Sequence, residues 1–225
     1  MLNNQIKNDK KHICLSLSRS GTSYIDKCFI KSGLQSFHFP FQLYFNINSD
    51  ILTRYSAFSD SPIPLIYKKL DKIYPNSKYI ISIRNKKEWL SSMEWLFTHG
   101  KAKWWWHYNI RKYHSELYGT WKFHEKRFSI FHDGYHEHIL EYFKQRRHQL
   151  FIFNLDEGLD SDQFCKFLDI SFTKMPQLAS NQRTNVSLRR RICYSFYESL
   201  SVNRTIDRYL HKKGFVRKLR ELSNK

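Results

Sequence analysis

Residues 16–23 read Ser-Leu-Ser-Arg-Ser-Gly-Thr-Ser and close an apolar segment that begins at His12. The pattern predicts a short buried strand from His12 to Leu17, a tight turn with one glycine, and a helix from about Thr22 to Lys31. A strand-to-helix turn of this kind directs several backbone N–H groups and a helix N-terminus at one point, which attracts a phosphate or a sulfate. A positive charge comes from Arg19, and further donors come from the hydroxyl groups of Ser18, Ser20, Thr22 and Ser23.

The same turn departs from the loop that binds nucleoside triphosphates together with magnesium. That loop reads G-x-x-x-x-G-K-S/T, in which the lysine reaches the outer phosphates and the neighbouring hydroxyl binds magnesium. Here Thr22 follows Gly21 directly, and Ser16 stands where the first glycine would be. The residues of the turn alone leave two interpretations open, an anion site without magnesium and an ordinary turn.

The composition is that of a basic globular protein. A chain of 225 residues is long enough for one well-buried α/β domain, and its 41% hydrophobic and 17% aromatic content excludes a disordered chain. The formal net charge of +18 predicts acidic partners: nucleic acid, an anionic membrane surface, a polyanionic substrate or a phosphate-rich cofactor. A solvated basic surface without a dedicated ligand is the alternative, and charge alone does not separate the two.

Targeting and membrane signals are absent from the sequence pattern. Residues 1–11 are polar and lack the apolar core of a signal peptide, and no run of about 18 apolar residues predicts a transmembrane helix. The four cysteines are far apart and form no C-x-x-C pair, so they indicate reduced thiols in a reducing compartment. We therefore expect a cytoplasmic protein, whose charge is compatible with peripheral contact with an anionic surface.

Short strands and helices alternate along much of the chain. Strands are expected at residues 35–39, 57–59, 78–83 and 150–155, and helices at 50–55, 64–73, 86–97 and 161–168, the last with Ser161 as its N-cap. Strand–helix alternation with short connections predicts a parallel sheet covered by helices. Residues 101–148 are aromatic, rich in histidine and predicted to be all helical, either as the core of an inserted subdomain or as a lid or acceptor-binding wall.

One cluster of histidines in this helical region shows part of the residue spacing of a metal site. Its members are His132, Asp133, His136 and His138, and His132 and His136 are one helical turn apart. The cluster does not reproduce H-E-x-x-H, and no third ligand is evident, so we expect no metal.

Arg84 forms a second candidate anion site. It stands at the C-terminal end of the strand expected at 78–83, where open α/β sheets place their ligand crevice, and Ser92 follows eight positions later on the next helix. The guanidinium fork of an arginine grips a phosphate, and a serine hydroxyl adds a donor. Together with the turn at 18–23, the chain offers two anion sites at one sheet edge, which suits a ligand with two separated phosphate-type groups.

With both motifs in this order, the sequence resembles the P-loop sulfotransferases, which use 3′-phosphoadenosine 5′-phosphosulfate (PAPS). The first motif of that family commonly reads P-K-S-G-T-T and grips the 5′-phosphosulfate; residues 18–23 are similar to it. The second is an arginine with a serine eight residues later, which grips the 3′-phosphate; Arg84 and Ser92 match it. Residues 57–62 and 74–84 also resemble the run D-x-P … Y-P-x-a-K-f-I-l-x-x-R.

The resemblance implies one three-layer domain of the P-loop type across residues 1–225, with a central, mostly parallel sheet flanked by helices. It covers roughly residues 12–97 and 150–176; residues 101–148 form a helical insertion, and residues 186–225 form a basic helical region that is either solvated or binds a polyanion. The implied reaction transfers a sulfuryl group from PAPS, without a metal, to a hydroxyl or amine acceptor. The aromatic insertion and the charge suggest a carbohydrate or other small molecule, and no specific nucleic acid is expected.

The resemblance also implies roles for single residues. Arg19 stands where the family usually has lysine, and it would neutralise the departing phosphate. Asp60 occupies the position of the catalytic base, with a helix N-cap as the alternative; His38 is the second candidate, with a core-edge histidine as its alternative. Arg183 is the candidate residue for the third nucleotide-binding motif.

Three other classes of function stay open at this point. A small-molecule kinase on a P-loop fold lacks its lysine motif here, and a basic nucleic-acid-binding module lacks any recognisable binding motif. An inactive protein with the sulfotransferase fold is the third.

Overall fold

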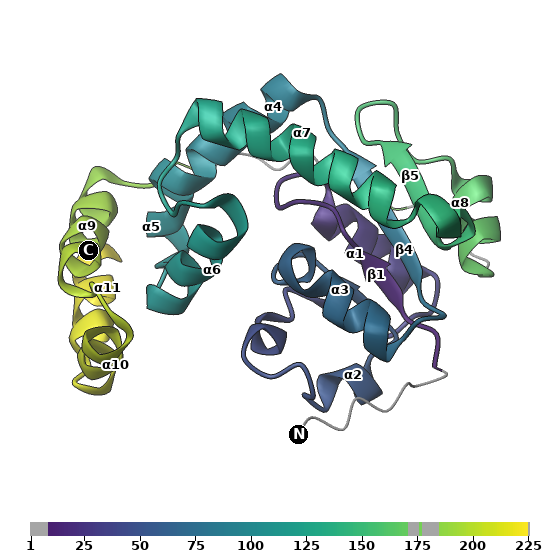
Figure 1. Ribbon diagram of the computed structural model, residues 1–225. Coiled ribbons are helices and arrows are strands. Elements are labelled where there is room, and N and C mark those ends of the chain that lie inside the picture. Colours follow the sequence, from purple (N-terminus) through teal and green to yellow (C-terminus); the bar gives the residue numbers. More distant parts are fainter. Residues whose placement is uncertain (1–8, 171–175, 177–184, 225) are drawn as a thin grey trace. The chain divides into compact units, whose positions relative to one another are not determined.

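The computed structural model describes residues 9–170, 176 and 185–224 (Figure 1). The chain forms two compact units. Unit 1 consists of Met1–Trp89 and His132–Ser180, and unit 2 of Leu90–Phe131 and Asn181–Lys225. The single domain across residues 1–225 stays a prediction.

Unit 1 is built from alternating strands and helices, as the sequence predicts. Its elements, in chain order, are β1 (His12–Cys14), α1 (Thr22–Lys31), β2 (Ser36–His38), the 3-10 helix η1 (Phe41–Tyr44), α2 (Ile51–Arg54), β3 (Ala57–Ser59), α3 (Ile63–Ile73), β4 (Lys78–Ile83), the first turn of α4 (Lys86–Trp95), the second half of α7 (Glu125–Tyr142), the 3-10 helix η3 (Lys144–Gln149), β5 (Leu150–Asn154) and α8 (Ser161–Leu168).

The N-cap predicted for α8 is wrong by one residue. Asp160, not Ser161, caps the helix, because its carboxylate accepts hydrogen bonds from the backbone N–H groups of Asp162 and Gln163, both at 3.0 Å. Asp160 has extended backbone angles (φ −67°, ψ 110°), whereas Ser161 is already the first helical residue. A capping residue must lie outside the helix for its side chain to reach back to the first free N–H groups.

The five strands form one parallel sheet in the order β2-β3-β1-β4-β5. The central strand β1 pairs with β3 on one side and β4 on the other, so that Ile13 lies opposite both Phe58 and Tyr79. Since all strands run in the same direction, their carboxyl ends meet at one edge. The chain passes from β3 across β1 to β4, so the loop after β1 lies at a topological switch point, where sheets of this kind bind ligands.

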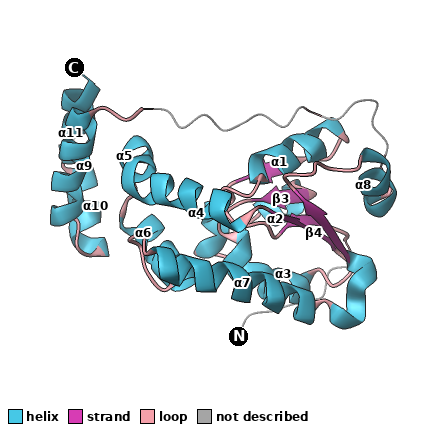
Figure 2. Ribbon diagram, turned by 90° about the horizontal axis from the view of Figure 1, so that it is seen from above, coloured by secondary structure: helices cyan, strands magenta, loops and turns pink. Residues whose placement is uncertain are grey.

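Helices cover both faces of the sheet, which gives the three layers that the sequence predicts. Figure 2 shows α1 and α8 on one face and α3 and the second half of α7 on the other. On the α1 and α8 face, the buried core consists of Cys14, Ile25, Cys28, Phe29, Ala57, Ile80, Phe153, Leu155, Phe164 and Leu168. On the opposite face, the ring of Tyr79 packs on Phe143, with centroids 4.7 Å apart. The fold class is therefore α/β with a parallel central sheet.

A buried carboxylate fastens α3 to the layer that contains α7. Asp71 is 6% exposed and accepts two hydrogen bonds from the Arg146 guanidinium, at 2.9 and 2.8 Å. The hydroxyls of Tyr142 (2.6 Å) and Tyr79 (3.1 Å) also donate to it. Burial by itself raises the pKa of Asp71, but the hydrogen bonds from Arg146 and the tyrosines outweigh burial and lower it below its ordinary value.

Replacing Asp71 with Asn should destabilise the protein by about 2 kcal/mol at pH 7, because it leaves Arg146 without its counter-charge. Breaking a fully buried ion pair costs more, but the Arg146 side chain is 33% exposed and remains partly solvated. A carboxylate with a lowered pKa contributes stability above the pKa of the unfolded chain, and this contribution is lost as the pH falls through the folded pKa. Urea unfolding of both proteins should therefore show a difference at pH 7 that shrinks below about pH 4. Glu141→Gln, which removes an exposed charge from α7, is the control, and an equal effect of both changes would contradict this account.

The described part of unit 2 consists of helices and their connections, and it includes residues 101–131 of the region 101–148 that is predicted to be helical; residues 132–148 belong to unit 1. Unit 2 contains the rest of α4 and the first half of α7, together with the π-helical turn η2 (Leu96–Gly100), α5 (Lys101–Trp104), α6 (Tyr108–Tyr118), α9 (Leu188–Leu200), α10 (Arg204–Lys212) and α11 (Phe215–Asn224). Trp105 and Trp106 are 2% and 5% exposed and belong to the core, whereas Trp104 is 48% exposed. Across the described residues, no helix is both long enough and apolar enough to span a bilayer.

Candidate active site

The turn between β1 and α1 is fastened to β4 by buried serines. Ser16, Ser20 and Ser82 are all fully buried. The backbone N–H of Ser82 donates to the hydroxyl of Ser16 at 2.8 Å, and the hydroxyl of Ser82 donates to the carbonyl of Ser20. The position of the turn is therefore set by β4, the strand next to the central strand β1.

Two side chains hold the next carbonyl groups of the turn. Trp89 Nε1 donates to the carbonyl of Ser18, and an Arg84 guanidinium nitrogen donates to the carbonyl of Arg19, each at 3.0 Å. Arg19 has a φ of 70°, a left-handed conformation that reverses the chain here. With Ser82, these donors direct three consecutive carbonyl oxygens at β4 and α4, rather than at the N-terminus of α1.

The N-terminus of α1 has the properties of an anion site. Gly21 is its N-cap, no described side chain caps the helix, and the first turn has no acidic residue. The hydroxyl of Ser20 is buried and has no hydrogen-bond partner among the described residues. An anion at this point would satisfy the free N–H groups of the helix, so the residues present fit a phosphate or sulfate group.

Gly21→Ala should distort the turn and weaken anion binding. Gly21 has a φ of 85°, and an added Cβ would lie 2.7 Å from Leu155 Cδ1. The left-handed backbone costs an alanine about 1–2 kcal/mol, and the contact with Leu155 adds to this. We expect the 3′-phosphoadenosine 5′-phosphate (PAP) affinity to fall together with the melting temperature, measured by calorimetry and thermal unfolding.

Gly33 provides the control for that variant. Its φ is 77°, and a Cβ added there would have nothing within 4 Å of it, so Gly33→Ala introduces the same backbone strain without the contact. It should lower stability and leave PAP affinity unchanged. If both variants bound PAP like the unchanged protein, the turn would not be the anion site.

Asp60 directly follows β3, and its carboxylate contacts the turn. Oδ1 accepts hydrogen bonds from the Ser18 hydroxyl (3.0 Å) and the Ser61 N–H (2.7 Å), and Oδ2 accepts one from the Thr22 hydroxyl (3.2 Å). The alternative that this side chain is a helix N-cap is wrong. Helix α3 has Pro62 as its N-cap, without a side-chain hydrogen bond, and only the backbone carbonyl of Asp60 accepts from Ile63 N–H.

His38, the last residue of β2, lies beside Asp60. Its Nε2 is 3.4 Å from Asp60 Oδ2 and 3.2 Å from the Ser23 hydroxyl, and its Nδ1 is 2.9 Å from the Ser59 hydroxyl. Ser59 in turn donates to the carboxylate of Asp26 at 3.4 Å. The imidazole therefore has a partner on each nitrogen, and it joins two carboxylates across the edge of the sheet.

The structure thus brings together most of the predicted site residues of unit 1. The turn, Asp60 and His38 form one hydrogen-bonded cluster, and Arg84 reaches the same turn from β4. Sequence reasoning missed Asp26, Ser59 and Trp89. Their signals are weak: Ser59 only neighbours Asp60, and Asp26 and Trp89 lie within segments whose pattern predicts ordinary helices.

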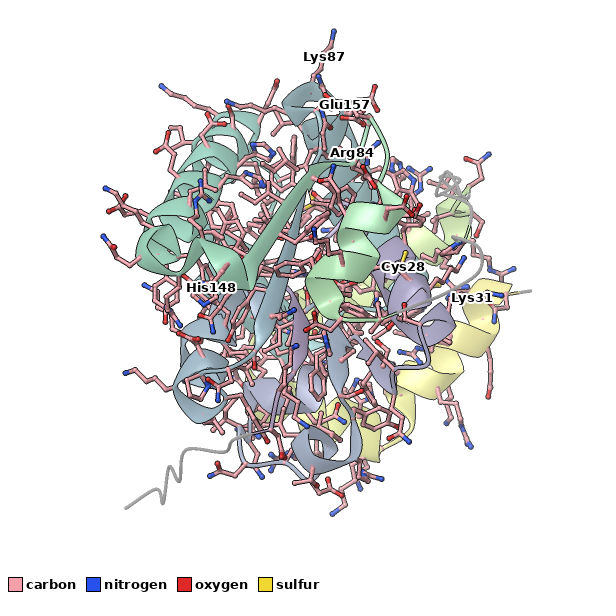
Figure 3. The ribbon with its side chains drawn as sticks, turned by 90° about the vertical axis from the view of Figure 1, so that its right-hand side faces the viewer. Cys28, Lys31, Arg84, Lys87, His148 and Glu157 are labelled. Carbon is pink, nitrogen blue, oxygen red and sulfur yellow. The ribbon has the colours of Figure 1, made fainter. Side chains whose placement is uncertain are left out.

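Arg84 lies at the carboxyl end of β4, as predicted. One guanidinium nitrogen binds the Arg19 carbonyl, and another is 3.2 Å from Glu88 one turn into α4. Next to it, the Asn85 N–H donates to the carboxylate of Asp156 after β5, at 2.6 Å. Figure 3 shows Arg84 and Glu157 at the same end of unit 1 and His148, before β5, away from it. The Arg84 side chain retains 23% exposure, so it can still contact a ligand.

The contacts described above do not test two of the predicted nucleotide-binding residues, Ser92 and Arg183. Ser92 is 2% exposed and lies on the part of α4 that belongs to unit 2. Arg183 lies outside the described residues. Both assignments stay predictions.

The histidine cluster of α7 is packed rather than arranged around a common point. His132 lies against Trp89, with ring centroids 4.9 Å apart, and His136 Nδ1 donates to the His132 carbonyl at 2.7 Å. Burial lowers the pKa of both histidines, that of His136 to about 4. Within the described parts of the chain, no group of three or more His, Cys, Asp or Glu side chains could hold a metal ion.

Comparisons with known proteins give one family. A family profile described as "Sulfotransferase domain" matches residues 46–186, which is more than half of the chain. The matched range contains Asp60, Arg84 and Ser92, but not the turn at 18–23. No curated protein matches. Among solved structures, a sulfotransferase from Alicyclobacillus acidocaldarius is 15% identical, with a TM-score of 0.49 over 85% of this chain and 92% of that chain.

Proposed function

The chain belongs to the sulfotransferase domain family, and on that premise we propose that it transfers a sulfuryl group from PAPS to a hydroxyl or amine group of a glycan or other small-molecule acceptor. One observation carries the PAPS part of the proposal. The uncapped N-terminus of α1 and the guanidinium of Arg84 meet at the same turn, since Arg84 binds the Arg19 carbonyl. A donor with phosphate groups at both its 3′ and 5′ positions requires two such groups.

The proposed site assigns different parts of the donor to different residues. We assign the 5′-phosphosulfate to the N–H groups of residues 21–23, the Ser20 hydroxyl and Arg19. The N–H of Ser20 is not included, because it donates to the Leu17 carbonyl at 3.0 Å. Arg84 would hold the 3′-phosphate, and the two residues that the resemblance adds, Ser92 for this phosphate and Arg183 for the rest of the nucleotide, stay predictions. No metal is required, because backbone dipoles and arginines supply the positive potential.

In the proposed reaction, an oxygen or nitrogen atom of the acceptor forms a bond to sulfur. The bond between sulfur and the bridging oxygen of the 5′-phosphate breaks, and PAP leaves with the electron pair. Asp60 is proposed to take the proton of the acceptor, since its carboxylate lies beside the turn and is 18% exposed. The hydrogen bonds from Ser18 and Thr22 fix the orientation of the Asp60 carboxylate, and His38 would stabilise the negative charge on its Oδ2 atom.

The competing functions have less support. A kinase requires a lysine motif that the turn lacks, and a nucleic-acid-binding module would not account for the family match or for the carboxylate beside an anion site. All four cysteines are free thiols, which supports the cytoplasm as the proposed location.

Arg84→Gln tests the donor assignment. The unchanged protein should bind PAP more tightly than 5′-AMP, which lacks the 3′-phosphate. Loss of a charged hydrogen-bonding partner should weaken PAP binding by about tenfold or more, so the variant should bind PAP and 5′-AMP alike. Isothermal calorimetry of both ligands measures this.

Lys87→Gln is the control, because it removes the same charge from an exposed position on α4. It should preserve the preference for PAP. A loss of both ligands in Arg84→Gln would mean that Arg84 only supports the turn through the Arg19 carbonyl. Retention of the full preference would exclude Arg84 from the 3′-phosphate site.

A further inference from the structure

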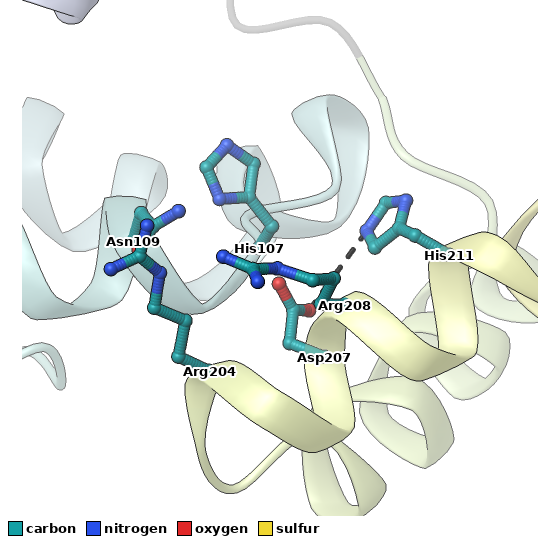
Figure 4. A pocket seen from close by; sticks show the side chains of 6 residues that line it. All are labelled: His107, Asn109, Arg204, Asp207, Arg208 and His211. Carbon is teal, nitrogen blue, oxygen red and sulfur yellow. Dashed lines mark ion pairs between the residues drawn. The ribbon is translucent and has the colours of Figure 1, made fainter.

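Unit 2 contains a cavity of about 290 Å³ that plays no part in the proposed donor site. It lies between the start of α6 and one face of α10, as Figure 4 shows. The lining residues are His107, Asn109, Arg204, Asp207, Arg208 and His211. The volume is at the lower end of the range for small-molecule sites, and is enough for about one ring with its substituents.

Two arginines from α10 make the cavity attractive to an anion. Arg204 and Arg208 are one helical turn apart, and Figure 4 shows their guanidinium groups extended toward His107 and Asn109. Arg208 makes no hydrogen bond or ion pair with any residue in the described ranges 9–170 and 185–224. Two guanidinium forks that converge in this way bind the oxygen atoms of a sulfate, phosphate or carboxylate.

A buried carboxylate lies in the same cavity. Asp207 is 6% exposed, and its Oδ1 accepts a hydrogen bond from the Tyr197 hydroxyl and is 3.9 Å from His211 Nε2. Its Oδ2 has no hydrogen bond to a residue that the structure describes, so it can accept one from a ligand. A ligand that only carried negative charge would be repelled by this carboxylate. The cavity therefore suits a ligand that has hydroxyl donors next to its anionic group.

The α6 side of the cavity supplies neutral polar groups. His107 is the N-cap of α6 in an extended conformation, and its side chain does not cap the helix. Burial lowers the pKa of His107, so its imidazole is neutral near pH 7. Together with the amide of Asn109, it offers both donors and acceptors, which is how sugar hydroxyls are usually recognised.

We propose that this cavity binds one anionic sugar unit of an acidic glycan, with its sulfate or carboxylate between Arg204 and Arg208 and its hydroxyls toward Asp207 and Asn109. The inference rests on the proposed function only in treating that glycan as the acceptor. The net charge of +18 favours a polyanion over a neutral sugar for the rest of the ligand.

The test is calorimetric titration of a heparin-derived tetrasaccharide, without any donor, at 150 mM salt. The double variant Arg204→Gln, Arg208→Gln should raise the dissociation constant about tenfold or more, since each lost charged contact is worth a factor of several. Arg208→Gln alone should raise it about threefold or more. The control Arg217→Gln, Lys218→Gln removes the same charge from exposed positions on α11 and should change it less than about twofold.

Three outcomes would overturn the inference. These are no binding of the tetrasaccharide, an equal loss in the test and control variants, and stronger Arg208-dependent binding of a random oligonucleotide of similar charge. Thermal unfolding of each variant checks that the fold is kept, and Arg208→Gln decides the matter if the double variant fails to fold. PAP titration of the same proteins separates the two proposals. Binding of PAP without binding of the glycan would refute only the proposal for the cavity, and binding of the glycan without binding of PAP would refute only the proposed donor site.

Discussion

Asp60→Asn is expected to lower kcat by about 10²- to 10⁴-fold, the usual contribution of a general base, while PAP still binds. The amide keeps the Oδ1 acceptor for the Ser18 hydroxyl and the Ser61 N–H, so the turn should survive. What it loses is the ability to take a proton. Transfer from labelled PAPS to a heparin-derived oligosaccharide, with PAP affinity measured alongside, separates catalysis from binding.

His38→Gln is the companion variant, because His38 is the second candidate for the base and contacts the same carboxylate at 3.4 Å. A positioning role predicts a smaller loss, about tenfold, from one missing hydrogen bond. If Asp60→Asn turned over at the normal rate and His38→Gln did not, the base would be His38. Normal turnover by both variants would show that neither Asp60 nor His38 takes part in catalysis.

Arg19→Ala should lower kcat by about 10²- to 10³-fold, which is typical when one donor to a developing negative charge is removed. The charge on the leaving phosphate grows as the bond to sulfur breaks, and Arg19 is the cation within the turn itself. Arg19→Lys should recover part of the rate, because lysine restores the charge but not the planar fork. Single-turnover assays with saturating PAPS measure the step directly.

Lys31→Ala provides the matched control for Arg19, since it removes one positive charge from the far end of α1. It should leave kcat unchanged within about twofold, because exposed charges at that distance are screened. Equal losses from both changes would mean that Arg19 acts only through the overall positive potential.

The sequence predicted the sheet well, because its signals are local. The run Lys78–Ile83, with three isoleucines, has the pattern of a buried strand. The four predicted strands after the first are each followed by a proline, an aspartate or an arginine. The turn at 18–23 was also predictable, since a glycine between a strand and a helix marks a point where the backbone can adopt the left-handed conformation of a tight turn. The division into two units was not, because it depends on contacts of α5 with α9 and of α6 with α10, which are distant in sequence.

The side-chain partners within the site could not be predicted in the same way. The hydrogen bond from Trp89 to the Ser18 carbonyl joins residues 71 positions apart, and no spacing rule predicts it. The chain from Asp26 through Ser59 to His38 requires the register that places His38 opposite Ser59. Asp60 was predictable as a candidate because it follows a strand, but its contact with the turn follows from the parallel pairing of β1 and β3.

The most direct test of the account is a calorimetric titration of the unchanged protein with PAP in the presence of EDTA, next to ATP with magnesium. The account predicts saturable binding of PAP at one site without any metal, at least about tenfold tighter than ATP with magnesium. Absence of PAP binding, or tighter binding of ATP with magnesium, would contradict the claim that the turn and Arg84 form a PAPS site.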